Sequence, residues 1–232
     1  NREPLYPLLV SVSMRLAALA RFSYQSVLLL LQIGVLLLSQ RLLFLILREV
    51  RVRPGITAGI IFYFGISPAV VNSALSLYSE IISYPLVLMI IYWSLLCLKE
   101  KALSPAGRLL FKGLTLGALL FLLTMAKAIT EAVAPVFMLS LFTGKIFFDR
   151  AGSRQAFGRN TIMVGSGLIV FFVLISGYKF LNYRYNGSFS LTNRGAEALY
   201  GNTARRVDPS AVKRIPAALA SIPGPEFCPA LL

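Results

Sequence analysis

The sequence contains no histidine, and this absence removes several kinds of active site at once. Without imidazole there is no histidine metal ligand, no histidine general base and no Ser-His-Asp triad. Cysteine is almost absent too, since only Cys97 and Cys228 occur, and their positions match neither a disulfide framework nor a zinc site. Any catalysis must therefore use carboxylates, lysine, arginine or tyrosine, and we predict neither a metal nor a cofactor.

Charged residues are also scarce. They make up 14% of the chain, whereas about 25% of the residues in a soluble domain are charged. Hydrophobic residues make up 57% of the chain, whereas roughly 45–50% is usual in a soluble domain. So few polar residues cannot cover a water-exposed surface, and we predict an integral membrane protein. The formal net charge of +14 is explained by basic residues that meet anionic lipid headgroups, so membrane lipids and no nucleic acid are the expected partners.

Long apolar runs dominate what is present. A helix needs about 20 apolar residues to cross roughly 30 Å of hydrocarbon. The runs that meet this length are 22–47, 55–76, 81–98, 108–126, 129–148 and 160–180. Polar and apolar residues do not alternate in them, which excludes a barrel. We predict an all-α bundle of about six transmembrane helices over 1–181, preceded within it by an interfacial helix at 4–20, and an extramembrane segment at 182–232.

Lysine and arginine concentrate in alternate loops, and this sets the expected orientation. The basic loops contain Arg48, Arg51 and Arg53; Lys99, Lys101 and Arg108; and Arg150, Arg154 and Arg159. Short loops rich in lysine and arginine stay in the cytoplasm. Residues 1–21, the turn around Glu80, Lys127 and 181–232 are therefore predicted to lie on the outer side.

Three ionisable residues at the outer ends of the spans are candidate site residues, because charge is costly there. Glu80 separates two long uncharged runs, at a depth where a carboxylate can act on an acceptor. Lys127 can bind a phosphate as a point charge. Glu131 follows four residues later, a helical spacing that lets it hold Lys127 in place. The structural alternatives are an interfacial turn for Glu80 and an ion pair that only holds the turn for the other two.

The C-terminal segment adds a possible sugar and phosphate site. Arg194 and Arg205 flank Tyr200 and Asn202. Arginine binds phosphate through two hydrogen bonds, and an aromatic ring with an amide suits a sugar. A basic segment that contacts lipid headgroups is the alternative.

Near the start, Arg2-Glu3-Pro4-Leu5-Tyr6-Pro7-Leu8-Leu9 resembles the R-x-P-L-Y-P-L-L stretch of membrane glycosyltransferases with the GT-C fold. This group includes the protein O-mannosyltransferases and the lipid A aminoarabinose transferases. The order of elements after it is similar to theirs over about 1–180, with Glu80 at the position of a family carboxylate and Lys127 close to an L-T-(R/K) boundary.

The resemblance implies an inverting enzyme that moves a sugar from a polyprenyl-phosphate donor to a lipid, glycan or protein acceptor. It also implies that the enzyme acts at the outer face of a bacterial inner membrane. Under the same resemblance, Glu80 is a catalytic residue and Tyr6 is one of the substrate-binding residues. The family's catalytic base is an aspartate expected upstream of Pro4, so the 232 residues alone are expected to be inactive.

Two other functions fit the same residues. In a transporter or flippase of a lipid-linked substrate, Glu80, Lys127 and Glu131 would line the pathway. Two related halves are common in transporters, and the sequence shows no such repeat. A non-catalytic membrane scaffold is the other alternative.

Overall fold

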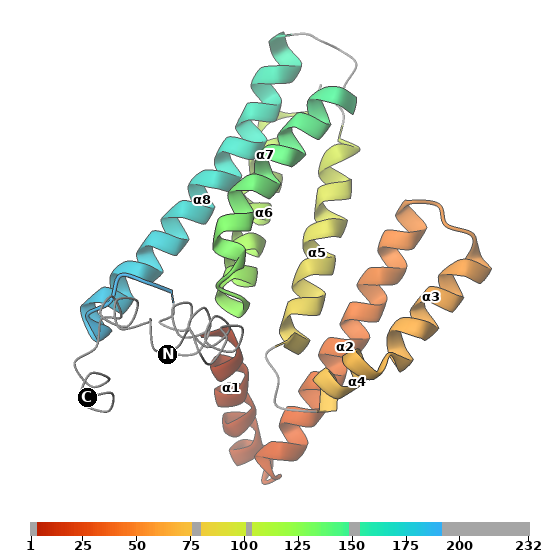
Figure 1. Cartoon of the computed structure of the whole chain (residues 1–232), viewed down its shortest axis with the longest axis vertical. Coiled ribbons are helices and arrows are strands. Elements are labelled where there is room, and N and C mark those ends of the chain that lie inside the picture. Colours follow the sequence, from red (N-terminus) through yellow and green to blue (C-terminus); the bar gives the residue numbers. More distant parts are fainter. Residues whose placement is uncertain (1–3, 76–79, 101–103, 149–153, 192–232) are drawn as a thin grey trace, which may run out of the picture. The chain divides into compact units, whose positions relative to one another are not determined.

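The structure, a computed structural model, describes residues 4–75, 80–100, 104–148 and 154–191. Helices are the only regular elements among these residues (Figure 1), which confirms the predicted all-α class. In chain order they are α1 (Leu5–Ala20), α2 (Tyr24–Glu49), α3 (Pro54–Ile66), α4 (Pro68–Leu75), α5 (Glu80–Leu98), α6 (Ala106–Ala126), α7 (Thr130–Phe148) and α8 (Arg154–Asn186).

Several of these helices suit a membrane protein. Among the described residues, α2, α5, α6 and the Asn160–Asn186 part of α8 are long and apolar enough to cross a bilayer. The pair α3 and α4 would be a fifth span, bent by 49°. The predicted count of about six spans is thus not confirmed. The run predicted at 55–76 is broken because Pro68 disfavours a helical conformation at the residue before it.

The helix expected at 4–20 is present as α1. It ends where Arg21 adopts a left-handed conformation, with φ 56°, and its N–H bonds the carbonyl of Ala17. Ser23 then starts α2, because its hydroxyl accepts a hydrogen bond of 3.2 Å from the N–H of Ser26. These two capping contacts set the connection between α1 and α2, while the location of α1 at a membrane interface stays a prediction.

Helix α6 is the centre of the fold. It contacts α5, α7 and α8, and these helices are neighbours in Figure 1. Side chains from all four form the main core, among them Ile90, Leu116, Leu120, Met138, Met163 and Phe171. One face of α6 is buried along most of its length, from Leu109 to Ala126, and it includes Gly113 and Gly117.

The two ends of this bundle hold different polar groups. Helix α5 has 19 residues, so it is about 28 Å long. Glu80 begins it, and Glu100 lies just beyond its other end. We call these the Glu80 end and the Glu100 end of the bundle. Lys127, which follows α6, lies at the Glu80 end because it contacts Glu80 itself.

Candidate functional site

An ion pair joins Glu80 and Lys127 at the Glu80 end. The Lys127 Nζ lies 2.5 Å from the Glu80 Oε1. The two residues are 47 positions apart in sequence and meet because the start of α5 packs beside the end of α6. Their side chains are 45% and 30% exposed, respectively. The structure thus brings these two candidate residues together, while their roles in binding and catalysis stay predictions.

The turn between α6 and α7 fixes the position of Lys127. Its N–H donates to the carbonyl of Leu123 at 2.8 Å, which closes the last turn of α6. Its carbonyl accepts a hydrogen bond of 2.8 Å from the Thr130 hydroxyl. Thr130 also contacts the hydroxyl of buried Thr124 at 3.2 Å. Two threonines thus hold the backbone from which the Lys127 side chain reaches Glu80.

The predicted pairing of Lys127 with Glu131 is wrong. Glu131 instead accepts a hydrogen bond of 2.5 Å from the Nζ of Lys179 in α8. The four-residue spacing predicts a contact only within a continuous helix. Here α6 ends at Ala126 and α7 begins at Thr130, so a turn separates the two side chains. Glu131 therefore does not hold Lys127 in place; Glu80 does.

Lys179 is a residue that the sequence reasoning missed. It lies within the last apolar run, predicted at 160–180, and a cation there is costly unless it is paired. The cost that singles out Glu80, Lys127 and Glu131 applies to Lys179 as well, so the signal is present in the sequence. Its ion pair with Glu131 joins α7 to α8 at the same end of the bundle.

Tyr6 lies in α1 and is partly buried. The Gln32 amide of α2 donates to its hydroxyl at 3.4 Å. Burial raises the pKa of Tyr6, and the hydrogen bond from Gln32 offsets part of this effect. The preceding residue, Leu5, packs against a buried cluster formed by Met125, Ile175 and Leu191. The start of α1 is thus close to the end of α6, on the same side of the bundle as Lys127.

The remaining predicted site residues lie outside the described part of the chain. These are Arg194, Tyr200, Asn202 and Arg205, whose roles stay predictions. Among the described residues, no group of three or more acidic or cysteine side chains could hold a metal ion.

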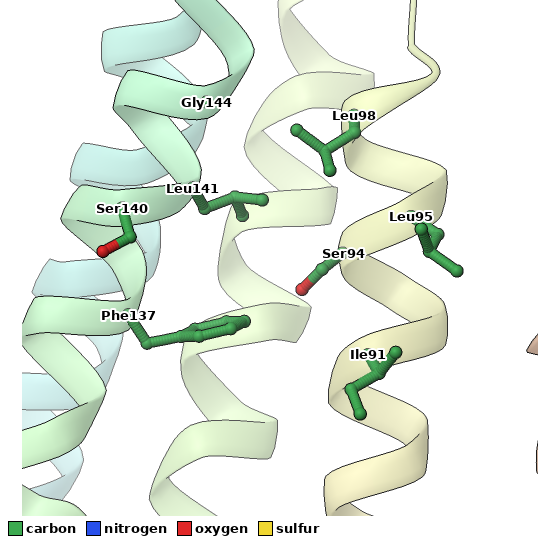
Figure 2. Close-up of a pocket in the computed structure, with 8 residues that line it drawn as sticks. All are labelled: Ile91, Ser94, Leu95, Leu98, Phe137, Ser140, Leu141 and Gly144. Atoms are coloured by element: carbon green, nitrogen blue, oxygen red, sulfur yellow. The ribbon is translucent and has the colours of Figure 1, made fainter.

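A pocket of about 290 Å³ lies between α5 and α7, and neither Glu80 nor Lys127 lines it (Figure 2). The Ser94 hydroxyl points from α5 into this space and has no hydrogen-bond partner among the described residues. The other lining residues carry no charge: Ile91, Leu95, Leu98, Phe137, Ser140, Leu141 and Gly144. Without a cation the pocket does not suit a phosphate, so the ion pair of Glu80 and Lys127 remains the candidate site.

Comparisons of the chain with protein-family models, with curated proteins and with solved structures return no match.

Proposed function

We propose that this chain is the membrane part of a glycosyltransferase that takes its sugar from a polyprenyl-phosphate donor. The observation that carries the proposal is the contact between Glu80 and Lys127 at one end of the helical bundle. A phosphate on a lipid meets the protein at the membrane boundary, where a cation must be available without full burial. Lys127, 30% exposed and anchored by a carboxylate, has these properties.

Lys127 is suited to hold the donor phosphate. Its ammonium gives one hydrogen bond to Glu80, and a lysine ammonium has further N–H donors for phosphate oxygens. Glu80 limits the motion of the long lysine side chain, so less conformational entropy is lost on binding. As the sugar leaves, negative charge grows on the phosphate, and a fixed ammonium stabilises that charge.

The proposed reaction is a single displacement. An acceptor hydroxyl or amine attacks the anomeric carbon, the bond from that carbon to the phosphate oxygen breaks, and polyprenyl phosphate leaves with the electron pair. The acceptor proton passes to a carboxylate base. The resemblance implies an aspartate as that base, and Glu80 is proposed to orient the acceptor beside it.

Donor binding tests this proposal without requiring turnover. The purified chain in nanodiscs is titrated with a polyprenyl phosphate and, separately, with the uncharged polyprenol. Lys127→Met should weaken binding of the phosphate by about one to two decades, the value of a charge-assisted hydrogen bond of roughly 1.5–3 kcal/mol. Binding of the polyprenol should not change.

Lys179→Met is the matched control, because Lys179 also forms an ion pair of 2.5 Å at the same end of the bundle. It should leave the affinity for polyprenyl phosphate within about threefold of the wild type. Wild-type affinity in Lys127→Met would contradict the proposal. Equal losses in both lysine variants would also contradict it, since they would show that the ion pairs act only on the fold.

A further inference from the structure

A second pocket, with a charged lining, lies at the Glu100 end, between α5 and α6. Its volume is about 430 Å³. Lys99, Arg108 and Lys112 line it together with a single carboxylate, that of Glu100. The charged groups of the pocket wall therefore carry a net positive charge. The pocket is separated from the Glu80 end by the length of α5, so it does not depend on the function proposed above.

The Glu100 carboxylate already has hydrogen-bond partners within the protein. Its carboxylate accepts hydrogen bonds from the Lys112 ammonium and, at 2.5 Å, from the Ser104 hydroxyl. Lys112 also donates to the carbonyl of Leu96 at 2.8 Å, at the end of α5. The hydrogen bond from Lys112, followed by that from Ser104, lowers the pKa of Glu100, so it stays ionised near neutral pH. Lys112 and Glu100 thus neutralise each other at the base of the pocket.

Arg108 and Lys99 are the cations open to a ligand. The Arg108 guanidinium forms an ion pair with Glu100, through Nε at 3.5 Å, and its side chain is 65% exposed. Lys99 is 52% exposed and bonds the carbonyl and the carboxylate of Glu49. The terminal nitrogens of Arg108 match the geometry of a phosphate, which accepts paired hydrogen bonds from a guanidinium.

An apolar surface continues from these cations along α6. Phe111 and Leu114 are 61% and 36% exposed, and their three-residue spacing places them on one helical face. Trp93 stacks edge to face with Phe111 at 6.3 Å, and its indole N–H donates to the Lys112 carbonyl at 3.1 Å. A tryptophan with one bonded polar edge is typical of the boundary between hydrocarbon and headgroups.

We propose that this pocket binds the headgroup phosphate of an anionic phospholipid, with Arg108 as the main contact and Lys99 as the second. The acyl chains would lie along Phe111 and Leu114. Basic pockets between transmembrane helices bind anionic headgroups in this way. The orientation predicted from the basic loops places the Glu100 end on the cytoplasmic side, where anionic lipids are abundant.

Native mass spectrometry of the purified full chain tests this assignment. The protein is mixed with equal amounts of phosphatidylglycerol and phosphatidylcholine in detergent. Phosphatidylglycerol should be retained about tenfold more, and Arg108→Gln should remove most of this preference. Arg108→Lys, which keeps the charge, should retain part of it, and Lys99→Gln should cause a smaller loss than Arg108→Gln.

Arg184→Gln is the matched control, because Arg184 is an exposed arginine near the end of α8. It should retain the wild-type preference, and millimolar inorganic phosphate should not displace the bound lipid. Equal retention of the two lipids by the wild type would overturn the proposal. The same loss in Arg184→Gln as in Arg108→Gln, or displacement by inorganic phosphate alone, would overturn it as well.

Discussion

A β-carbon at Gly117 of α6 would overlap the backbone carbonyl oxygen of Gly167 in α8. The same close approach occurs one turn earlier, where a β-carbon at Gly113 would meet the carbonyl of Met163. Glycines four residues apart let helix backbones touch, an arrangement common between transmembrane helices. The contact between α6 and α8 is thus made by main chain as well as by side chains.

Gly117→Ala should therefore destabilise the protein by roughly 1–3 kcal/mol, because the added methyl group would overlap the backbone carbonyl of Gly167, which is held rigidly in α8. This cost opposes the gain in helix propensity of about 1 kcal/mol that alanine brings. Gly34→Ala in α2 is the control, since a β-carbon there meets no atom of the described residues within 4 Å. Thermal unfolding in detergent measures both. Equal melting temperatures for the two variants would show that α6 and α8 are not this close.

Part of this contact is visible in the sequence. Gly113 and Gly117 stand four apart in the run predicted at 108–126, which we interpreted only as a span. Hydropathy shows that a helix is apolar, and it does not show which face packs on a neighbour. The partner glycine, Gly167, is more than forty residues away in sequence, so pairing it with Gly117 required the structure.

The ion pairs at the Glu80 end predict a specific pattern of coupling. Double-mutant cycles with Lys127→Met and Glu80→Gln should give a coupling energy of about 0.5–1 kcal/mol, as expected for partly exposed pairs. Lys179→Met and Glu131→Gln should give a similar value. Lys127→Met and Glu131→Gln should be additive, because these residues belong to different pairs. Chemical denaturation in detergent gives the free energy of unfolding of each variant. A coupling energy between Lys127 and Glu131 would support the pairing predicted from sequence and contradict the one in the structure.

Much of this site is predictable from sequence because charge is costly in an apolar environment. That cost draws attention to Glu80, Lys127 and Glu131, and it applies equally to Lys179. The predicted pairing failed because it assumed a helix through residues 127–131, where the chain instead makes a turn stabilised by Thr130. A threonine three residues after a lysine, as Thr130 follows Lys127, is not a strong sequence signal for a turn. Contacts between residues 47 or 48 positions apart depend on helix packing, which a single sequence does not specify.

The orientation of the bundle can be tested by labelling single cysteines. Ile129 is 81% exposed in the turn between α6 and α7, at the Glu80 end, and Val50 is 56% exposed just after α2, in a basic loop. In a Cys228→Ser background, with buried Cys97 retained, Ile129→Cys should react with an impermeant maleimide in intact cells. Val50→Cys should react only after lysis, because its loop is predicted to be cytoplasmic. The reverse pattern would invert the topology.

The Glu100 network should make stability depend on pH in the acidic range. Lys112 holds the folded pKa of Glu100 below its ordinary value of 4.5. The stabilisation is therefore complete above that ordinary value and is lost as pH falls through the lower folded pKa. Glu100→Gln should be less stable than the wild type at pH 7, and the difference should shrink on acidification. Melting curves at several pH values measure it; a constant difference would exclude this linkage.

Within the proposed transferase reaction, Glu80 and Lys127 should have separable kinetic effects. Glu80→Gln keeps the size of the side chain and removes its charge, so orientation of the acceptor is lost and kcat should fall more than the KM for donor rises. Lys127→Met removes the contact with the donor phosphate and should raise that KM by about one to two decades. Lys127→Arg should recover part of the loss, since the charge persists with a different geometry.

The measurement is sugar transfer from a polyprenyl-phosphate donor by the protein in its native membranes, with each variant at matched expression. Because the two residues are hydrogen-bonded at 2.5 Å, each substitution also alters its partner, so the double variant is needed. If the pair acts as one unit, Glu80→Gln and Lys127→Met together should cost less than the product of the two single effects. Wild-type transfer by both single variants would leave the pair a purely structural contact between α5 and the turn after α6.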